Sequence, residues 1–503
     1  MKQYILAHDL GTSGNKAVLY SLDGRLVKSA VYSYPLLVPK ANWAEQQADD
    51  WWKAVCETTK ELMQEIPPSQ IAAVSFSGQM MGCLCVDDHG VPVHNALIWA
   101  DMRPTEQEAF VRSRIDPMEY YQLTGHRISA SYSCMKLMWL RDNLPDVYAK
   151  TYKMLNAKDF ILFRLTGNFV TEPSDASSTC LMDLKKQEWS DELFQLTELP
   201  RDKMPEILRS IDLAGTVTRE ASKQTGLLEG TPVVCGGGDA CCAAVGTGVV
   251  REGAANCCMG TSSWISVASK APVCDDGMTI INWAHIVPGY ILPNGTMQAG
   301  GGALSWAVDC LYACLEGTPA PDKNAIYASV NQEAEASGIG AQDLLFLPHL
   351  MGERSPRWND KVKGSFVGLT LKHKRGDMLR AVMEGVGFNL DIILQTMLRN
   401  GCDIDSLLLV GGGARNRVWQ RILCDMFGLP MAVPADLEEA TSMGAVITGG
   451  VGIGAFDSFD EVNKFLKIKE ENTPDPENHR IYTQRKPLFE EAYQAVYPVF
   501  ERM

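Results

Sequence analysis

The sequence predicts an α/β protein made of two large domains that face each other across a deep cleft. Three observations lead to this prediction. The chain has 503 residues, more than one hydrophobic core usually organises. A Gly-Thr-Ser turn between two apolar runs occurs once in each half, at 11–13 and at 260–262. The first half also opens on short apolar runs joined by tight turns, as antiparallel strands do.

The composition narrows the class of protein. Hydrophobic residues make up 46% of the chain and charged residues 21%, which is ordinary for a soluble globular protein. The net charge of −15 disfavours nucleic acid as a partner, because nucleic acid requires a basic face. No apolar run approaches the roughly 20 residues of a membrane span, and no signal peptide precedes the first strand. We therefore expect a cytoplasmic protein with no nucleic-acid or membrane partner.

The cysteines predict buried, reduced thiols. There are 15 of them, most are isolated, and the close pairs at 83/85, 241/242 and 257/258 lie in largely apolar segments. Cys-x-x-Cys and Cys/His ligand spacings are absent from the sequence. Disulfides, a zinc site and a thiol-redox role are therefore the less favoured interpretations.

The first Gly-Thr-Ser turn has the composition of a phosphate-binding loop. Gly11 lets backbone amides approach an anion, while Thr12 and Ser13 add hydroxyl donors and Lys16 adds a positive charge. Asp9, at the end of the preceding strand, is placed to hold a hydrated Mg²⁺ or to orient a substrate hydroxyl. For this turn alone, an ordinary hairpin is an equal alternative.

The second turn decides between these interpretations. Gly260 and Thr261 repeat the pattern between two apolar runs, which suggests two similar domains facing one polyphosphate. In this feature the chain resembles the FGGY carbohydrate kinases of the actin-like ATPase superfamily, and within them the xylulokinase branch. The resemblance extends from Tyr4 to about Gly450 and includes two extended signature patterns, at 131–143 and 364–384.

The resemblance implies two ribonuclease-H-like domains, a sugar-binding one at 1–248 and a nucleotide-binding one at 249–503. It also implies that ATP and Mg²⁺ are required. The antiparallel strands at the start fit such a domain and do not fit a Rossmann start. The expected partner is a small-molecule sugar, and a homodimer is a possible assembly.

Two strand ends in the first half resemble the family's sugar-binding loops. One apolar run spans 71–76 and the other spans 96–98. Ligands of open α/β sheets lie at the carboxyl ends of such strands. For the Trp-x-Asp-x-Arg group at 99–103, a strand cap with a surface ion pair is the alternative. The sugar contacts that the resemblance implies are Gln79, Met80, Met81, Trp99 and Asp101, together with Asp239 further along the chain.

The proton acceptor is expected after three glycines. A short apolar strand runs into Gly236, Gly237 and Gly238, and Asp239 follows. Phosphoryl transfer to a hydroxyl needs a base for its proton, and Asp239 resembles the family's catalytic base. A turn before a helix would give the same string of residues, but its register with the two phosphate loops favours the catalytic interpretation.

Two positions depart from the xylulokinase pattern. Met81 occupies the place of a histidine, and Ala240 occupies the place where xylulokinases commonly carry an asparagine. Both changes replace a polar group with an apolar one. The sugar is therefore left open: D-xylulose is the first candidate, and another ketose, a polyol or a sugar acid are alternatives.

Two glycine-rich turns in the second half predict a nucleotide site. One opens a helix near 300–306, where a helix N-terminus suits an anion or a ribose. The other follows the strand at 407–410 and leaves room for adenine to lie flat on backbone. Dinucleotide binding is the rival, but its acidic ribose residue does not follow at the right distance. The implied nucleotide contacts are Gly301, Ser305, Gly412 and Asn416, with the two Gly-Thr-Ser turns.

We therefore expect an ATP- and Mg²⁺-dependent kinase of a small sugar. Its rival from another class is a catalytically idle, actin-like ATP-binding protein. Such a protein would keep the phosphate loops and lose the base, whereas Asp9 and Asp239 are both present.

Overall fold

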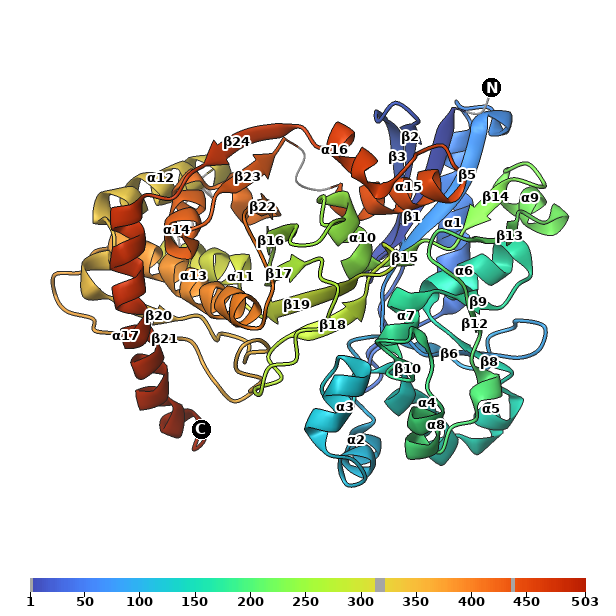
Figure 1. Cartoon of the computed structure of the whole chain (residues 1–503), viewed down its shortest axis with the longest axis horizontal. Helices are drawn as coiled ribbons and strands as arrows, with labels where there is room; N and C mark the ends of the chain where they lie inside the picture. The colour runs from blue at the N-terminus through green and yellow to red at the C-terminus, as the bar shows by residue number, and fades with distance from the viewer. Residues whose placement is uncertain (1–2, 313–321, 436–438) are drawn as a thin grey trace, which may run out of the picture.

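Two seven-stranded mixed sheets, one from each half of the chain, form the frame of the protein (Figure 1). The structure is a computed structural model that describes residues 3–312, 322–435 and 439–503. The first sheet has the strand order β13-β14-β5-β1-β2-β3, with β15 beside β5. Its strands are β1 (Tyr4–Leu10), β2 (Gly14–Ser21), β3 (Leu26–Ser33), β5 (Ile71–Gly78), β13 (Leu213–Thr216), β14 (Pro232–Val234) and β15 (Gly237–Gly238).

The second sheet repeats the plan of the first. In each, a set of antiparallel strands comes first in the sequence, and a parallel strand is then added beside the first strand of that set. The second sheet has one more antiparallel strand than the first, and its third and fourth strands exchange places in the sheet order. Its order is β18-β19-β17-β16-β22-β23-β24. The strands are β16 (Ala255–Met259), β17 (Ser263–Val267), β18 (Ile281–Ala284), β19 (Ile291–Met297), β22 (Leu407–Val410), β23 (Met431–Pro434) and β24 (Ile468–Asn472). The predicted fold class, α/β with two ribonuclease-H-like units, is confirmed.

Helices and small two-stranded ladders complete the fold. The helices of the first half are α1 (Ala48–Met63), α2 (Thr105–Arg112), α3 (Pro117–Thr124), α4 (Ser133–Asn143), α5 (Pro145–Lys150), α6 (Ala157–Thr166), α7 (Pro173–Ser178), α8 (Asp191–Thr197), α9 (Arg219–Thr225) and α10 (Asp239–Gly246). Those of the second half are α11 (Gly301–Leu311), α12 (Lys323–Ser337), α13 (Arg375–Arg399), α14 (Arg417–Phe427), α15 (Ala440–Gly452), α16 (Val462–Phe465) and α17 (Pro476–Phe500). The ladders pair β4 (Glu45–Gln46) with β7 (Ala96–Leu97), β6 (Leu84–Val86) with β8 (Lys153–Leu155), β9 (Val170–Thr171) with β12 (Glu206–Ile207), β10 (Met182–Asp183) with β11 (Glu188–Trp189), and β20 (Leu345–Leu347) with β21 (Ser365–Val367).

Both faces of the first sheet are covered. Alternate side chains of β1 point to opposite faces, so Leu6 packs in one core with α1 and α6, and Ile5 packs in another with α15. Every residue of β5 is buried, as expected for a parallel strand covered on both sides. The carboxyl ends of β1 and β5 therefore lie side by side at one edge of this sheet, where Asp9 pairs in register with Ser77.

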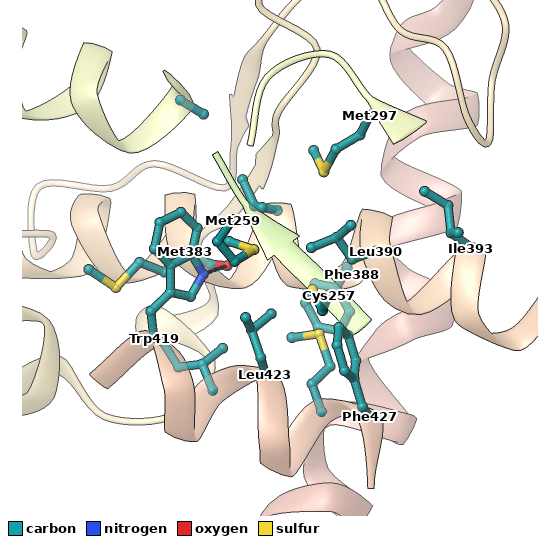
Figure 2. Close-up of a cluster of buried hydrophobic side chains, with 14 of the residues drawn as sticks. Cys257, Met259, Met297, Met383, Phe388, Leu390, Ile393, Trp419, Leu423 and Phe427 are labelled. Atoms are coloured by element: carbon teal, nitrogen blue, oxygen red, sulfur yellow. Dashed lines mark hydrogen bonds between the residues drawn. The ribbon is translucent and has the colours of Figure 1, made fainter. Parts of the chain in front are cut away.

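The core of the second unit lies between its sheet and α13 and α14. Figure 2 shows Met259 of β16 among Met383, Trp419 and Leu423, which come from these two helices. The indole N–H of Trp419 donates to the carbonyl of Met383 at 3.0 Å. Among the described residues, α13 alone has the length and apolar composition of a membrane span, and 83% of its apolar 18-residue stretch is buried inside the protein.

The two halves cross at α10 and α15. Although α15 lies late in the sequence, it packs on β1 and β5 of the first sheet (Figure 1). The crossing is close because both helices carry glycine there: a Cβ on Gly246 would lie 1.8 Å from the carbonyl oxygen of Ala440, and one on Gly444 would lie 1.9 Å from that of Cys242. A boundary at 248/249 separates the strands of the two sheets. Helix α15 follows this boundary in the sequence, yet it packs on the first sheet.

Candidate active site

A cavity of about 720 Å³ lies between the two halves and is lined by residues of both. Its wall from the first half includes Met81, Tyr132, Asp239 and Ala240. Its wall from the second half includes Trp264, Gln298, Arg354 and Trp358. A volume of this size and a mixture of aromatic, apolar and polar groups suit a small organic substrate.

Asp239 is a carboxylate on the wall of this cavity. It is the first residue of α10, and its carboxylate accepts a hydrogen bond from the Ala240 amide at 2.7 Å. Burial, with the charge of Asp9 adding to it, raises the pKa of Asp239 to about 7. A general base works best with a pKa near the operating pH. The geometry therefore fits a proton acceptor at this position.

Asp9 lies near the end of β1, where its carboxylate accepts a hydrogen bond from the Ser77 hydroxyl at 2.9 Å. Burial raises the pKa of Asp9, while Ser77 and Lys16 oppose that shift. Lys16 itself forms an ion pair with Glu439, which directly precedes α15. In this arrangement the Lys16 charge is engaged by a carboxylate from the second half of the chain.

The first Gly-Thr-Ser turn is held by side chains from elsewhere in the first half of the chain. The Thr12 hydroxyl accepts from the Trp99 indole N–H at 2.9 Å, and the Thr12 carbonyl accepts from the Gln46 amide at 2.7 Å. The Tyr34 hydroxyl donates to the carbonyl of Gly11 at 2.5 Å. Ser13 is exposed. These contacts connect the turn to β4 and to the segment after β7.

Of the six predicted sugar contacts, Met81 and Asp239 line the large cavity. The other four are absent from its lining. Met80 is buried and fills the space beside Gly238, where a Cβ would lie 2.6 Å from its side chain. Met81 has a φ of 63°, a left-handed conformation that is strained for a residue with its side chain.

Gln79, Trp99 and Asp101 are engaged by other protein groups. Gln79 donates to Gln46 at 2.8 Å, and Trp99 is bound to the first turn as described. Asp101 is 0% exposed, and its carboxylate accepts from the Ala44 amide and from Arg103, which also pairs with Glu45. The ion-pair alternative for the 99–103 segment is therefore the arrangement seen, buried rather than on the surface.

A second cavity of about 570 Å³ lies in the second half. All six nucleotide contacts predicted there line it together: Gly260, Thr261, Gly301, Ser305, Gly412 and Asn416. The amides at the start of α11 donate to the carbonyls of the second turn, at 2.7 Å for Gly301 to Gly260 and 3.0 Å for Gly302 to Thr261. This contact places the glycine-rich turn directly against the Gly-Thr-Ser turn. Gly11, Thr12, Ser13 and Lys16 of the first half do not line this cavity.

The side-chain amide of Asn416 uses its oxygen within the protein and leaves its nitrogen without a partner among the described residues. Its side-chain oxygen caps α14 by accepting from the Trp419 amide at 2.9 Å. Its buried Nδ2 has no hydrogen-bond partner among the described residues, and a buried donor of this kind normally finds one. The vacant donor at the cavity wall suits an acceptor on a bound base or ribose.

Several lining residues carried no local sequence signal. In the nucleotide cavity these are Asn324, Tyr327 and Asn331 of α12. In the large cavity they include Arg127, Trp283 and Arg354. Each reaches its cavity through tertiary packing between segments distant in sequence, so local patterns could not identify it.

Comparison with known proteins identifies the family. Residues 4–246 match the N-terminal domain, and residues 255–453 the C-terminal domain, of the FGGY family of carbohydrate kinases. The chain is 31% identical to the xylulose kinase of Lactococcus lactis, over 98% of this chain and 96% of that one. It is 29% identical to the gluconokinase of Bacillus subtilis, over 97% and 95%.

Solved structures give the same result. The crystal structure of the xylulose kinase from Rhodospirillum rubrum superposes with a TM-score of 0.92 at 27% identity, over 99% of this chain and 100% of that one. The resemblance inferred from the two Gly-Thr-Ser turns is thereby confirmed. The chain belongs to the FGGY family of carbohydrate kinases and is an ATP-dependent sugar kinase.

Proposed function

We propose that this kinase phosphorylates a small open-chain sugar in the large cavity, with D-xylulose, giving D-xylulose 5-phosphate, as the first candidate substrate. The observation that carries the proposal is Asp239, a half-buried carboxylate with a pKa near 7 on the wall shared by both halves. The xylulose kinases that are similar over nearly the whole chain support the choice of sugar.

In this mechanism Asp239 accepts the proton of the attacking sugar hydroxyl. Met81 and Ala240 line the substrate side. Met80 packs beside Gly238, and Gln79, Trp99 and Asp101 hold neighbouring segments through their own hydrogen bonds. Thr12 and Ser13 present hydroxyls toward the phosphates from the first half, and Gly11, whose amide donates to the Gly14 carbonyl at 3.0 Å, closes the turn that carries them. Gly260, Thr261, Gly301, Ser305, Gly412 and Asn416 hold the nucleotide from the second. Closure of the two halves would bring the phosphate donor to the hydroxyl and exclude water.

The residues present fit a magnesium ion beside Asp9. Mg²⁺ is usually held by one or two carboxylates together with substrate phosphates, and Asp9 offers such a carboxylate at a strand end next to the first turn. Among the described residues, groups of three or more His, Cys, Asp or Glu arranged for a metal are absent, which agrees with a site completed by the substrate. The ion would neutralise charge on the phosphates. Lys16 would then exchange Glu439 for a phosphate oxygen.

We further propose a boundary at 248/249, with a sugar-binding domain before it and a nucleotide-binding domain after it. The family matches that end at 246 and begin at 255 support it. The cytoplasmic location, the absence of nucleic-acid and membrane partners, and the homodimer stay predictions from the sequence.

A sugar acid is a second candidate, because two arginines line the large cavity. The Arg127 guanidinium donates to the Gly277 carbonyl at 2.8 Å and lies 5.2 Å from the centre of the Trp358 ring. In the described part of the chain no hydrogen bond or ion pair engages the Arg354 side chain. A planar guanidinium is well matched to a carboxylate, and the similarity to a gluconokinase points the same way.

The test is an ADP-release assay with MgATP across ketoses, polyols and aldonic acids. The proposal expects one panel member to stimulate ADP release at least about tenfold over hydrolysis in water. D-xylulose as the best member supports the first candidate. An aldonate as the best member, with loss of that preference in Arg354→Leu, supports the second. Absence of stimulation by every sugar would contradict the proposed function.

A further inference from the structure

Helix α7 carries serines at positions 174, 177 and 178, and each accepts a hydrogen bond from a backbone amide of a different segment. In Figure 1 the helix lies at the junction of the two halves, and it contacts β15 and β18. We propose that α7 positions the reaction: Ser174 sets the catalytic base through the Gly238 amide, and Ser178 sets the substrate loop through the Met81 amide. This inference rests on the proposed role of Asp239.

Ser174 is the contact on the side of the base. Its side chain is fully buried, and its hydroxyl accepts from the Gly238 amide at 2.8 Å. The same hydroxyl donates to the Glu172 carboxylate at 2.6 Å. Because Gly238 directly precedes Asp239, this bond fixes the point at which β15 ends and α10 begins. A shift of about 1 Å at a reacting group can cost on the order of 10²-fold in rate.

Glu172 makes that contact rigid. Its carboxylate accepts from the backbone amides of Ser174 and Asp175 at the start of α7, and from the Ser210 hydroxyl at 2.7 Å. The residue is itself fully buried. With its donors fixed in this way, Glu172 holds the Ser174 hydroxyl in the orientation that leaves a lone pair for the Gly238 amide.

Ser178 is the contact on the substrate side. Its hydroxyl accepts from the Met81 amide at 3.1 Å and donates to the Asp175 carbonyl at 2.8 Å. The Met81 carbonyl accepts from Lys136 at 2.7 Å. Both backbone polar groups of Met81 are therefore held by side chains. A left-handed residue persists only where its surroundings enforce it, so Ser178 maintains the position of the Met81 side chain in the cavity wall.

Ser177 provides the internal control. It lies on the same helix, is equally buried, and accepts from the Ala284 amide of β18 at 3.2 Å. Neither Ala284 nor Ser177 lines the large cavity. Removal of this hydroxyl should therefore affect stability as the other two do, without a specific effect on the base or the substrate loop.

A buried cluster of charged side chains holds α7 in place. Lys158 contacts the carboxylates of Asp159 at 2.8 Å and Asp175 at 3.2 Å, and all three side chains are buried. Displacing α7 would separate these charges inside the protein, where an unpaired charge is strongly unfavourable. The helix is therefore a fixed reference from which the two serine contacts are made.

The test compares Ser174→Ala, Ser178→Ala and Ser177→Ala in steady-state kinetics with the best sugar of the panel. We expect Ser174→Ala to lower kcat by about 10–100-fold with KM for the sugar within about threefold. We expect Ser178→Ala to raise KM for the sugar by about tenfold with kcat within about threefold. Ser177→Ala should change neither constant by more than about threefold, although each variant loses one buried hydrogen bond and should lower Tm similarly.

Two further variants keep the test decisive. Ser174→Thr retains the hydroxyl and should recover most of kcat. Ser174→Cys has a side chain of similar volume that accepts hydrogen bonds weakly, so it should lower kcat by a smaller factor than Ser174→Ala does. This variant also replaces Ser174→Ala in the test if the alanine variant does not fold. The inference is overturned if the three alanine variants change kcat and KM alike, or if Ser174→Cys has the wild-type kcat.

Asp239→Ala, measured in parallel, separates this inference from the proposed function. If Asp239→Ala retains most of kcat, the base is misassigned, whatever the serine variants do. If Asp239→Ala is inactive and Ser174→Ala has the wild-type kcat, the base is correct and only the role of α7 fails.

Discussion

The two Gly-Thr-Ser turns occupy equivalent positions, between β1 and β2 in the first sheet and between β16 and β17 in the second, yet their surroundings differ. The first is bound by Trp99, Gln46 and Tyr34, all from the first half. The second is bound by the backbone amides that open α11 and forms the wall of the nucleotide cavity. The same local motif is therefore engaged in two different ways, which are set by the elements packed around it.

We infer from this difference that the two halves of the chain have separate roles. The second turn lines the cavity that we assign to the nucleotide, and within the described part of the chain no hydrogen bond engages the Thr261 hydroxyl. The first turn, held through Trp99 and Gln46, is connected to the residues that support the substrate side. Asp239, at the start of the helix that crosses α15, lies where the two sides meet.

The largest effect on kcat is expected from a change at Asp239. Asp239→Ala should lower kcat by about 10²–10⁴-fold, the usual contribution of a general base, while ADP binding measured by calorimetry stays within a few-fold. This outcome would show that the base can be removed without disturbing the nucleotide half. Retention of most of kcat would remove Asp239 from the mechanism.

A smaller but still large effect is expected on the substrate side alone. The double change Met81→His with Ala240→Asn adds two polar groups to the cavity wall. Each hydrogen bond to a sugar hydroxyl contributes on the order of 1–3 kcal/mol when its loss would leave a buried group unpaired. The ratio of kcat/KM for D-xylulose to that for the wild type's best sugar should therefore rise by roughly 10²–10³-fold.

KM for ATP should stay unchanged in this double variant, which confines the effect to the first half. Histidine tolerates the left-handed backbone at position 81 better than most residues, so the fold should be retained. A wild type that already prefers D-xylulose, combined with a double variant that is only impaired, would contradict this prediction.

The turns themselves give the smallest effect. Thr261→Val removes one hydroxyl from the nucleotide wall and should raise KM for ATP about 10-fold, as expected for a hydrogen bond to a charged group. Thr12→Val should raise it less, because the Thr12 hydroxyl already accepts from Trp99. Sugar preference should be unaltered in both variants. A shift of sugar preference in Thr261→Val would break the division between the halves.

The gathering of the residues that we assign to the nucleotide in one cavity was largely predictable from sequence, because backbone turns bring them together. Turns such as the one at Gly412 follow strand ends directly, and sheet pairing then brings those ends together. The sugar side was less predictable because side chains determine it. The Trp99–Asp101 segment resembled a sugar loop, but the ion pair of Asp101 with Arg103 and the contact of Trp99 with Thr12 depend on long-range packing.

The pH dependence of kcat/KM for the sugar, at saturating MgATP, tests the central claim most directly. Asp239 must be unprotonated to act as a base, and its pKa is raised to about 7 by burial and by Asp9. The account predicts that kcat/KM rises about tenfold per pH unit below about 7 and levels off above it. In Asp239→Asn, which cannot accept the proton, the residual rate should show no such rise through this range. A flat profile for the wild type, or the same rise and midpoint in Asp239→Asn, would contradict the account.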